Sequence, residues 1–201
     1  SEGLSKSCNI KEGQIFIHTS GSMPSKVLKP LQLKGGLIAS LHPLQTIANP
    51  KEGIKNIMES IFAIEGDEKA YPVITEIVEK LEGKPYYITE DKKPLYHLAA
   101  VISCNYFVTL VDISLKIFSS INIEQDVALD GLLKLVRGTM NNMESLGTKD
   151  ALTGPIARGD IDTVKGHIRA MKNYMPELIN LYEILGEQTV KLALEKGSLK
   201  P

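Results

Sequence analysis

Residues Leu95 to Val111 contain no Asp, Glu, Lys or Arg, and this run constrains the fold of the chain more than any other. Its apolar side chains fall on more than one helical face. The first stripe is Leu95, Leu98, Ile102, Thr109 and Ile113, and the second is Val101, Cys104, Val108, Val111 and Leu115. A helix that is apolar nearly all round lies in a membrane or in the middle of a protein.

A membrane span needs about 20 predominantly apolar residues. This run carries His97, Ser103 and Asn105, which disfavours a span. We therefore expect a long central helix that is buried by the rest of the chain or by a second copy of it.

Composition indicates an ordinary soluble globular protein. The 201 residues are 43% hydrophobic and 23% charged, enough for one large domain or two small ones. The net charge of −1 gives no reason to expect nucleic acid or an anionic membrane as a partner. Cys8 and Cys104 lie far apart, which favours reduced thiols and a cytoplasmic protein. We expect no signal peptide. The chain begins Ser-Glu-Gly without Met, and we expect that an N-terminal part precedes it.

Four short β-like runs precede Thr89 and alternate with helical stretches, which predicts an α/β layer. The runs are 14–18, 37–41, 61–64 and 85–88. The helical stretches are one turn over 24–28 and a longer helix over 68–81.

After Thr89 no strand candidate remains, and the pattern predicts helices only. Thr89 is a candidate cap for the central helix, and a second helix is expected to run from Asn122 to near Gly147. Asp160 is expected to cap a third helix, and Pro176 opens a fourth that stops at Gly197. The sequence thus predicts an α/β domain over 1–88 and an all-α domain over 89–201 that contains the long central helix.

Lys93 and His97 are spaced i, i+4, so their side chains meet on one face of that helix. Each would lower the pKa of the other, as a general acid or base near neutral pH requires. Asn105 lies two turns further and offers an amide donor. The alternative is a solvated lysine at a helix start and a satisfied core histidine.

Two strand ends carry further polar groups. His42-Pro43 ends one strand, and His18-Thr19-Ser20-Gly21 ends the preceding one. Strand ends in α/β sheets face the ligand crevice, so these residues are candidates for contact with a ligand. Each segment taken alone is also explained as a turn.

The loop Thr153 to Asp160 has more functional groups than a turn needs, and Arg158 in it is suited to bind a carboxylate or phosphate. The sequence contains no G-x-G-x-x-G, G-x-x-x-x-G-K-[ST], C-x-x-C or H-E-x-x-H motif. Nothing in it indicates a metal site or a covalent nucleophile.

Six segments together resemble a known group of proteins. They are HTSG at 18–21, SLHPLQT at 40–46, FAIEGD at 62–67, YHLAAVISCNY in the long helix, LVRGT at 135–139 and TGPIARGD at 153–160. In order and spacing they are similar to proteins that join a Rossmann-like NADP-binding domain to a C-terminal helical domain of unknown function. The wider relatives are pyrroline-5-carboxylate reductase, ketopantoate reductase, prephenate dehydrogenase and the β-hydroxyacid dehydrogenases.

The resemblance implies a two-domain, usually homodimeric, NAD(P)-dependent oxidoreductase with its active site between the domains. It places Thr19, Ser20 and Gly21 near the nicotinamide, and it likens His42-Pro43 to the His-Pro of prephenate dehydrogenases. Lys93 looks like the catalytic lysine of β-hydroxyacid dehydrogenases. Those enzymes have an Asn one turn after the lysine, where this chain has His97.

A second departure concerns the cofactor. The family begins with a strand and glycine-rich turn that hold the pyrophosphate, and this chain starts after them, so we expect a partial Rossmann-like layer that binds NADP or NAD weakly or not at all by itself. Two functions are compatible with these residues. The first is reduction or oxidation of a small oxo, imino or hydroxy acid, with Lys93 or His97 moving the proton and with His42, Asn105 and Arg158 placing the substrate. The alternative is a non-catalytic ligand-binding or dimerisation module.

Overall fold

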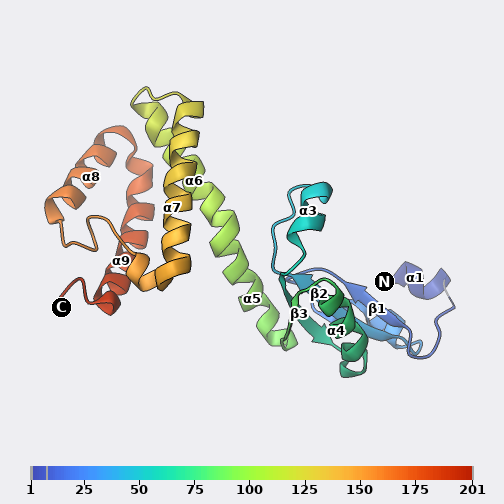
Figure 1. Cartoon of the computed structure of the whole chain (residues 1–201). Helices are drawn as coiled ribbons and strands as arrows, with labels where there is room; N and C mark the ends of the chain where they lie inside the picture. The colour runs from blue at the N-terminus through green and yellow to red at the C-terminus, as the bar shows by residue number, and fades with distance from the viewer. Residues whose placement is uncertain (1, 8, 201) are drawn as a thin grey trace. The chain divides into compact units, whose positions relative to one another are not determined.

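A mixed four-stranded sheet in the order β1-β2-β3-β4 organises the N-terminal part of the chain (Figure 1). The computed structural model describes residues 2–7 and 9–200. The strands are β1 (Ile15–His18), β2 (Leu37–Pro43), β3 (Ile61–Gly66) and β4 (Lys84–Tyr87). All four predicted strands are confirmed, and β2 continues two residues further than expected, through His42 and Pro43.

The register of the sheet places polar residues side by side. β1 and β2 are parallel, and His18 pairs with Ser40. β2 and β3 are antiparallel, and Ser40 pairs in turn with Glu65. Because paired residues on adjacent strands are close neighbours, His18, Ser40 and Glu65 form one row across the sheet. β3 and β4 are parallel.

The core of the sheet lies under the predicted helix over 68–81. That segment forms a 3-10 turn, η2 (Glu68–Ala70), followed by α4 (Tyr71–Lys80). Ile74 and Val78 of α4 are fully buried in the same apolar cluster as Phe62 and Ile64 of β3. Each such side chain contributes roughly 1.5–3 kcal/mol of burial free energy.

Short helices complete the surroundings of the sheet. The predicted turn over 24–28 is a 3-10 helix, η1 (Ser25–Leu28), and α2 (Lys29–Gln32) follows it. The sequence patterns did not predict α2, nor did they predict α1 (Glu2–Ser7) or α3 (Pro50–Asn56).

The charge-free run forms one long helix in three parts. A 3-10 turn, η3 (Glu90–Lys92), leads into α5 (Lys93–Ala100), a π-helical turn follows as η4 (Val101–Asn105), and the helix continues as α6 (Tyr106–Ser120). Pro94 lies in the first turn of α5, where its missing N–H costs nothing. The backbone of Thr89 occupies the cap position of η3, but its side chain makes no capping hydrogen bond.

The expectation that the rest of the chain buries this helix is wrong. None of its most apolar 18-residue window is buried. Ile102 is 54% exposed and Val108 is 67% exposed. The other expectation, burial by a second copy, stays a prediction. By length and composition the helix Glu90–Ser120 would also suffice to cross a membrane, although one such helix is weak evidence for a span.

The helices α7 (Gln125–Ala151), α8 (Ile161–Tyr174) and α9 (Ile179–Lys196) follow, with a 3-10 turn, η5 (Pro176–Leu178), before α9. The predicted stop near Gly147 is confirmed as a break, because this glycine has φ 75° and ψ 173° inside α7. Asp160 caps α8 as expected, since its carboxylate accepts from Thr163 N and Oγ1 at 3.0 and 2.7 Å. Gly197 ends α9 in the left-handed conformation. No strand occurs between residues 110 and 200.

The chain divides into two compact units, Ser1–Thr109 and Leu110–Pro201. The secondary structure changes from α/β to all-α at Thr89, where the sequence analysis placed the domain boundary. The first unit also includes α5 and η4. The boundary between 88 and 89 therefore stays a prediction.

Gly66 and Gly131 provide a matched test of the sheet geometry. Gly66 has φ 136°, and an added Cβ would lie 2.4 Å from Ile38 O and 2.7 Å from Ala39 Cα, so Gly66→Ala is expected to cost about 2–4 kcal/mol of unfolding free energy. Gly131 lies in α7 with nothing within 4 Å, so Gly131→Ala is expected to stabilise by roughly 0.5–1 kcal/mol. Urea unfolding of both variants measures the difference. Equal effects of the two substitutions would contradict this geometry.

Candidate functional site

Lys93 is the most deeply buried charged residue among the described side chains of the first unit. Its side chain has no exposed surface. Nζ donates to Ser40 Oγ at 2.6 Å and to the carbonyl oxygen of Ser20 at 3.3 Å. Burial lowers the pKa of Lys93, and the negative charge of Glu65 opposes this shift. The sequence analysis attributed a lowered lysine pKa to His97, whereas the structure attributes it to burial.

Glu65 is the carboxylate that faces this amine from β3. It is 6% exposed. Its two oxygens accept from Ser25 N and Ser25 Oγ, both at 2.7 Å. A buried carboxylate needs such donors because the protein interior solvates a charge poorly. Lys93 and Glu65 are therefore buried charges of opposite sign, each held by serines.

The segment after β1 is held by His18 and by the buried lysine. His18 Nε2 lies 3.2 Å from the carbonyl of Pro24, and His18 Nδ1 accepts from Ser20 N at 3.2 Å. These two bonds require the proton of the neutral ring to be on Nε2. Burial lowers the pKa of His18 and Lys93 lowers it further, while the Pro24 carbonyl and Glu65 raise it.

Two imidazoles converge on Gly21, which is itself buried. A Cβ added there would lie 2.8 Å from His42 Nε2 and 2.9 Å from His97 Nδ1. The two rings are nearly perpendicular, with an interplanar angle of 86° and ring centroids 6.1 Å apart. Only glycine leaves both rings where they are. His97 Nδ1 is buried and has no hydrogen-bond partner among the described residues.

His42 is held from its other side by Tyr96. The tyrosine hydroxyl lies 3.2 Å from His42 Nδ1. Burial lowers the pKa of His42, and the positive charges of His97 and Lys93 lower it further. Burial raises the pKa of Tyr96 to about 12, so its hydroxyl stays protonated at neutral pH. His42 is thus a neutral imidazole with a phenol against one nitrogen.

A cavity of about 460 Å³ in the first unit adjoins the two imidazoles, and ligand pockets are commonly of this size. Its wall combines imidazole and amide groups with aliphatic side chains. The lining residues are His42, Leu44, Gln45, Thr46, Ile47, Ala48, His97, Ala100, Cys104, Asn105 and Val108. The π-helical turn contributes Cys104 and Asn105, and turns of this kind are frequent at functional sites. We refer to this cavity as the imidazole cavity.

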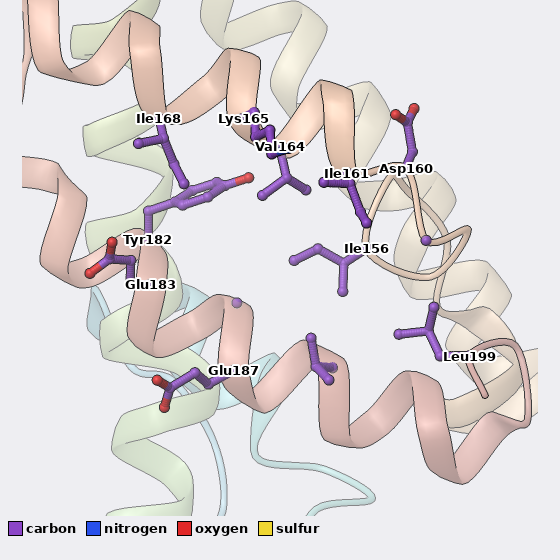
Figure 2. A pocket seen from close by; sticks show the side chains of 13 residues that line it. Ile156, Asp160, Ile161, Val164, Lys165, Ile168, Tyr182, Glu183, Glu187 and Leu199 are labelled. Carbon is purple, nitrogen blue, oxygen red and sulfur yellow. The ribbon is translucent and has the colours of Figure 1, made fainter. Parts of the chain in front are cut away.

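A second cavity, of about 490 Å³, lies in the second unit between α8, α9 and the loop before α8. Figure 2 shows Ile156, Val164 and Tyr182 pointing into it, with Glu183 and Glu187 on the α9 side. The Tyr182 hydroxyl lies 2.9 Å from His167 Nδ1. The wall of this second cavity is mainly aliphatic. The imidazole cavity offers imidazole and amide groups and is therefore better suited to catalysis.

Within residues 2–7 and 9–200, no group of three His, Cys, Asp or Glu side chains forms a metal site.

The structure brings together most of the residues that the sequence analysis singled out. His42, His97 and Asn105 line the imidazole cavity, and Gly21 contacts two of them. Lys93 does not line it. Arg158 is an exposed residue of the second unit, and its predicted role stays a prediction.

The sequence analysis missed Tyr96, Ser40 and Glu65, which share one network with the predicted residues. One signal was available for all three: they lie within the quoted segments YHLAAVISCNY, SLHPLQT and FAIEGD. Cys104 is a free cysteine, while Cys8 lies outside the described residues.

Comparison with known families matches residues 60–189 to a model described as "Domain of unknown function (DUF2520)". The match covers more than half of the chain. The protein belongs to the DUF2520 family. Comparison with curated protein sequences gives no match.

Solved structures similar to this DUF2520 protein share its fold. Protein TM1727 from Thermotoga maritima is 27% identical with a TM-score of 0.81, over 97% of this chain and 74% of that one. BF3122 from Bacteroides fragilis, named as a candidate NADP oxidoreductase, is 24% identical with a TM-score of 0.69, over 88% of this chain and 65% of that one.

The pyrroline carboxylate reductase of Plasmodium falciparum, solved with NADP bound, is 13% identical with a TM-score of 0.53, over 89% of this chain and 70% of that one. The likeness to these structures confirms the predicted fold, a Rossmann-like α/β layer followed by a helical region.

Proposed function

We propose that this DUF2520 protein is an NAD(P)-dependent oxidoreductase that acts on a small oxo, imino or hydroxy acid. One observation carries the proposal: two imidazoles from different elements meet at a buried glycine, beside a ligand-sized cavity, in a Rossmann-like fold. Imidazoles are the commonest proton donors and acceptors in enzymes near neutral pH.

The segment Thr19-Ser20-Gly21 fits the nicotinamide end of a dinucleotide. Residue 21 has no side chain, so nothing projects between the end of β1 and the two imidazoles. Ser20 is held through its N–H and its carbonyl, so the segment is ordered before any ligand binds. When bound, the reduced nicotinamide supplies a hydride. The chain contains no G-x-G-x-x-G turn for the pyrophosphate, so we expect weak binding of NADP or NAD to this polypeptide alone.

Reduction of a carbonyl or imine needs a proton as well as the hydride. The hydride forms a C–H bond at the carbonyl or imine carbon, and the π electrons of the C=O or C=N bond move to the oxygen or nitrogen. That atom then takes a proton, which gives a hydroxy or amino acid. We assign the transfer of this proton to His97 and the orientation of the reacting oxygen or nitrogen to His42. The amide of Asn105 lines the same cavity and is placed to bind the rest of the substrate.

Lys93 takes a different role in this proposal from the one expected from its sequence position. Its amine is bonded to Ser40 and Ser20 and has no exposed surface. We therefore assign Lys93 a positioning role, in which it fixes the segment after β1 and adds to the effect of burial, which lowers the pKa of His42. Arg158 remains a candidate for the carboxylate of the substrate, as the sequence analysis proposed.

The reductase proposal is tested with the full-length protein, NADPH and a panel of 2-oxo acids and cyclic imino acids, by following the loss of NADPH absorbance. His97→Asn is expected to lower kcat/KM by roughly 10²–10⁴-fold, because it removes the proton donor and keeps a polar side chain. His167→Asn, a change at an exposed histidine of the second unit, is the matched control and is expected to retain turnover. The proposal fails if NADPH gives no thermal protection and no compound is turned over.

A non-catalytic module is the second candidate function, and it is favoured by His97, which stands one turn after Lys93 where the β-hydroxyacid dehydrogenases have Asn. Such a protein would bind a ligand in the imidazole cavity without hydride transfer. Binding of a panel compound without any NADPH consumption in the full-length protein would support this alternative.

We further propose that the exposed apolar face of the long helix is covered by a second copy of the chain. Ile102 and Val108 are more than half exposed. A soluble protein rarely leaves so long an apolar helix uncovered. The partners of the proposed enzyme are then a small-molecule substrate and its own second copy, and a cytoplasmic location stays a prediction.

Light scattering after size exclusion tests the dimer. The wild-type protein is expected at twice the mass of one chain, and Ile102→Asp is expected to shift it to the mass of one chain by burying a charge in the interface. Val73→Asp, on α4 with 48% exposure, is the matched control and is expected to remain dimeric. A wild-type protein that is monomeric at micromolar concentration would exclude the proposal.

A further inference from the structure

The hydrogen bond between Tyr96 and His42 has no role in the function proposed above. Its partners come from different elements, since Tyr96 lies on α5 and His42 near the end of β2. The hydroxyl is 3.2 Å from Nδ1, and the rings meet edge-on at 88° with centroids 5.6 Å apart. This geometry fixes both the position and the orientation of the imidazole.

The direction of this hydrogen bond follows from the proton of the phenol. Burial holds the pKa of Tyr96 at about 12, so the hydroxyl carries its proton at neutral pH. Among residues 2–7 and 9–200, no acceptor for that proton other than His42 Nδ1 is within hydrogen-bond distance. If Nδ1 carried a hydrogen instead, the phenol proton would be left without a protein acceptor in a partly buried place, which is unfavourable.

We propose that Tyr96 is a positioning residue that fixes His42 as the tautomer with its hydrogen on Nε2, and so decides which atom of His42 is offered to a substrate. The use of that hydrogen in catalysis rests on the proposed reductase function. The tautomer itself does not.

The surroundings of Nε2 show what this tautomer achieves. Nε2 lies beside Gly21 and, within the described part of the chain, has no hydrogen-bond partner of its own. His97 Nδ1 lies beside the same glycine, buried and unpaired. The charged or titratable groups that act on His42 are Tyr96, His97 and Lys93, and the pKa of His42 is lowered first by burial and then by His97 and Lys93. His42 therefore presents a neutral N–H donor at the wall of the imidazole cavity, which suits a carbonyl oxygen or imine nitrogen.

Long-range ¹H–¹⁵N correlation of histidine-labelled protein at mildly alkaline pH reads the tautomer directly. In the wild type, His42 is expected to show a protonated Nε2 and an unprotonated Nδ1. In Tyr96→Phe, the proportion of the Nδ1–H form is expected to rise about fivefold, because one hydrogen bond to Nδ1 is lost while the ring is kept. His42→Gln assigns the signals by deletion.

Two controls distinguish this effect from loss of structure. His18 is an internal standard, because Ser20 N donates to its Nδ1, so it must remain the Nε2–H tautomer in every variant. Tyr106→Phe removes a hydroxyl from an exposed tyrosine further along the same helix and is expected to leave His42 unchanged. A wild-type His42 with its hydrogen on Nδ1, or a Tyr96→Phe spectrum identical to the wild type, would overturn the inference.

The catalytic consequence has its own readout. In the full-length protein, Tyr96→Phe is expected to lower kcat about fivefold and to leave the KM for NADPH unchanged, since Tyr96 orients a donor and does not bind the cofactor. Equal kcat for Tyr96→Phe and wild type would show that the tautomer is not used in turnover. If the wild type turns over no compound, the reductase proposal fails, while the NMR result still decides the tautomer.

Discussion

The buried amine of Lys93 is the interaction on which the first unit depends most. It joins the first turn of α5 to the sheet through Ser40, and to the segment after β1 through the carbonyl of Ser20. Among the described side chains of this unit, no other charged one is as deeply buried. Burying an ion costs several kcal/mol unless polar groups and an opposite charge compensate, and Ser40, Ser20 and Glu65 supply these. Removal of one member leaves the others unsatisfied, so the positions of the strand end and the helix are coupled.

That coupling explains how one site is assembled from distant parts of the sequence. With Lys93 fixed, the next turn of α5 places Tyr96 and His97 against His42 of β2. Gly21 follows Ser20, whose carbonyl accepts a hydrogen bond from Lys93, and it lies against both imidazoles. Positive charge from Lys93 also lowers the pKa values of His18 and His42, so the same interaction that positions these rings favours their neutral forms. A neutral imidazole donates one hydrogen bond and accepts one.

Much of this arrangement was predictable from local patterns, and the rest depends on contacts that a sequence does not display. The four strands, the α4 helix and the Asp160 cap followed from periodicity and capping residues, and six short segments indicated the family. His42 and His97 were identified because they lie at a strand end and on a charge-free helix. Tyr96 was missed because its partner is 54 residues away, and the full burial of Lys93 was not foreseen because spacing along a helix does not reveal burial. The π-helical turn has no Gly or Pro to signal it. The prediction that the long helix is buried is wrong for a single chain. Apolar composition does not indicate whether the same chain or a second molecule buries a helix.

Hydrogen exchange of the backbone amides in Lys93→Met, compared with the wild type, tests the central role of this lysine most directly. The substitution keeps an unbranched side chain and removes the hydrogen bonds of the amine. The predicted result is a joint loss of protection in Ser20–Met23 and in the first turns of α5, while the amides of α4, which is held by Ile74 and Val78, keep theirs. Unchanged protection in both segments, or loss in only one of them, would contradict the claim that Lys93 couples the strand end to the helix.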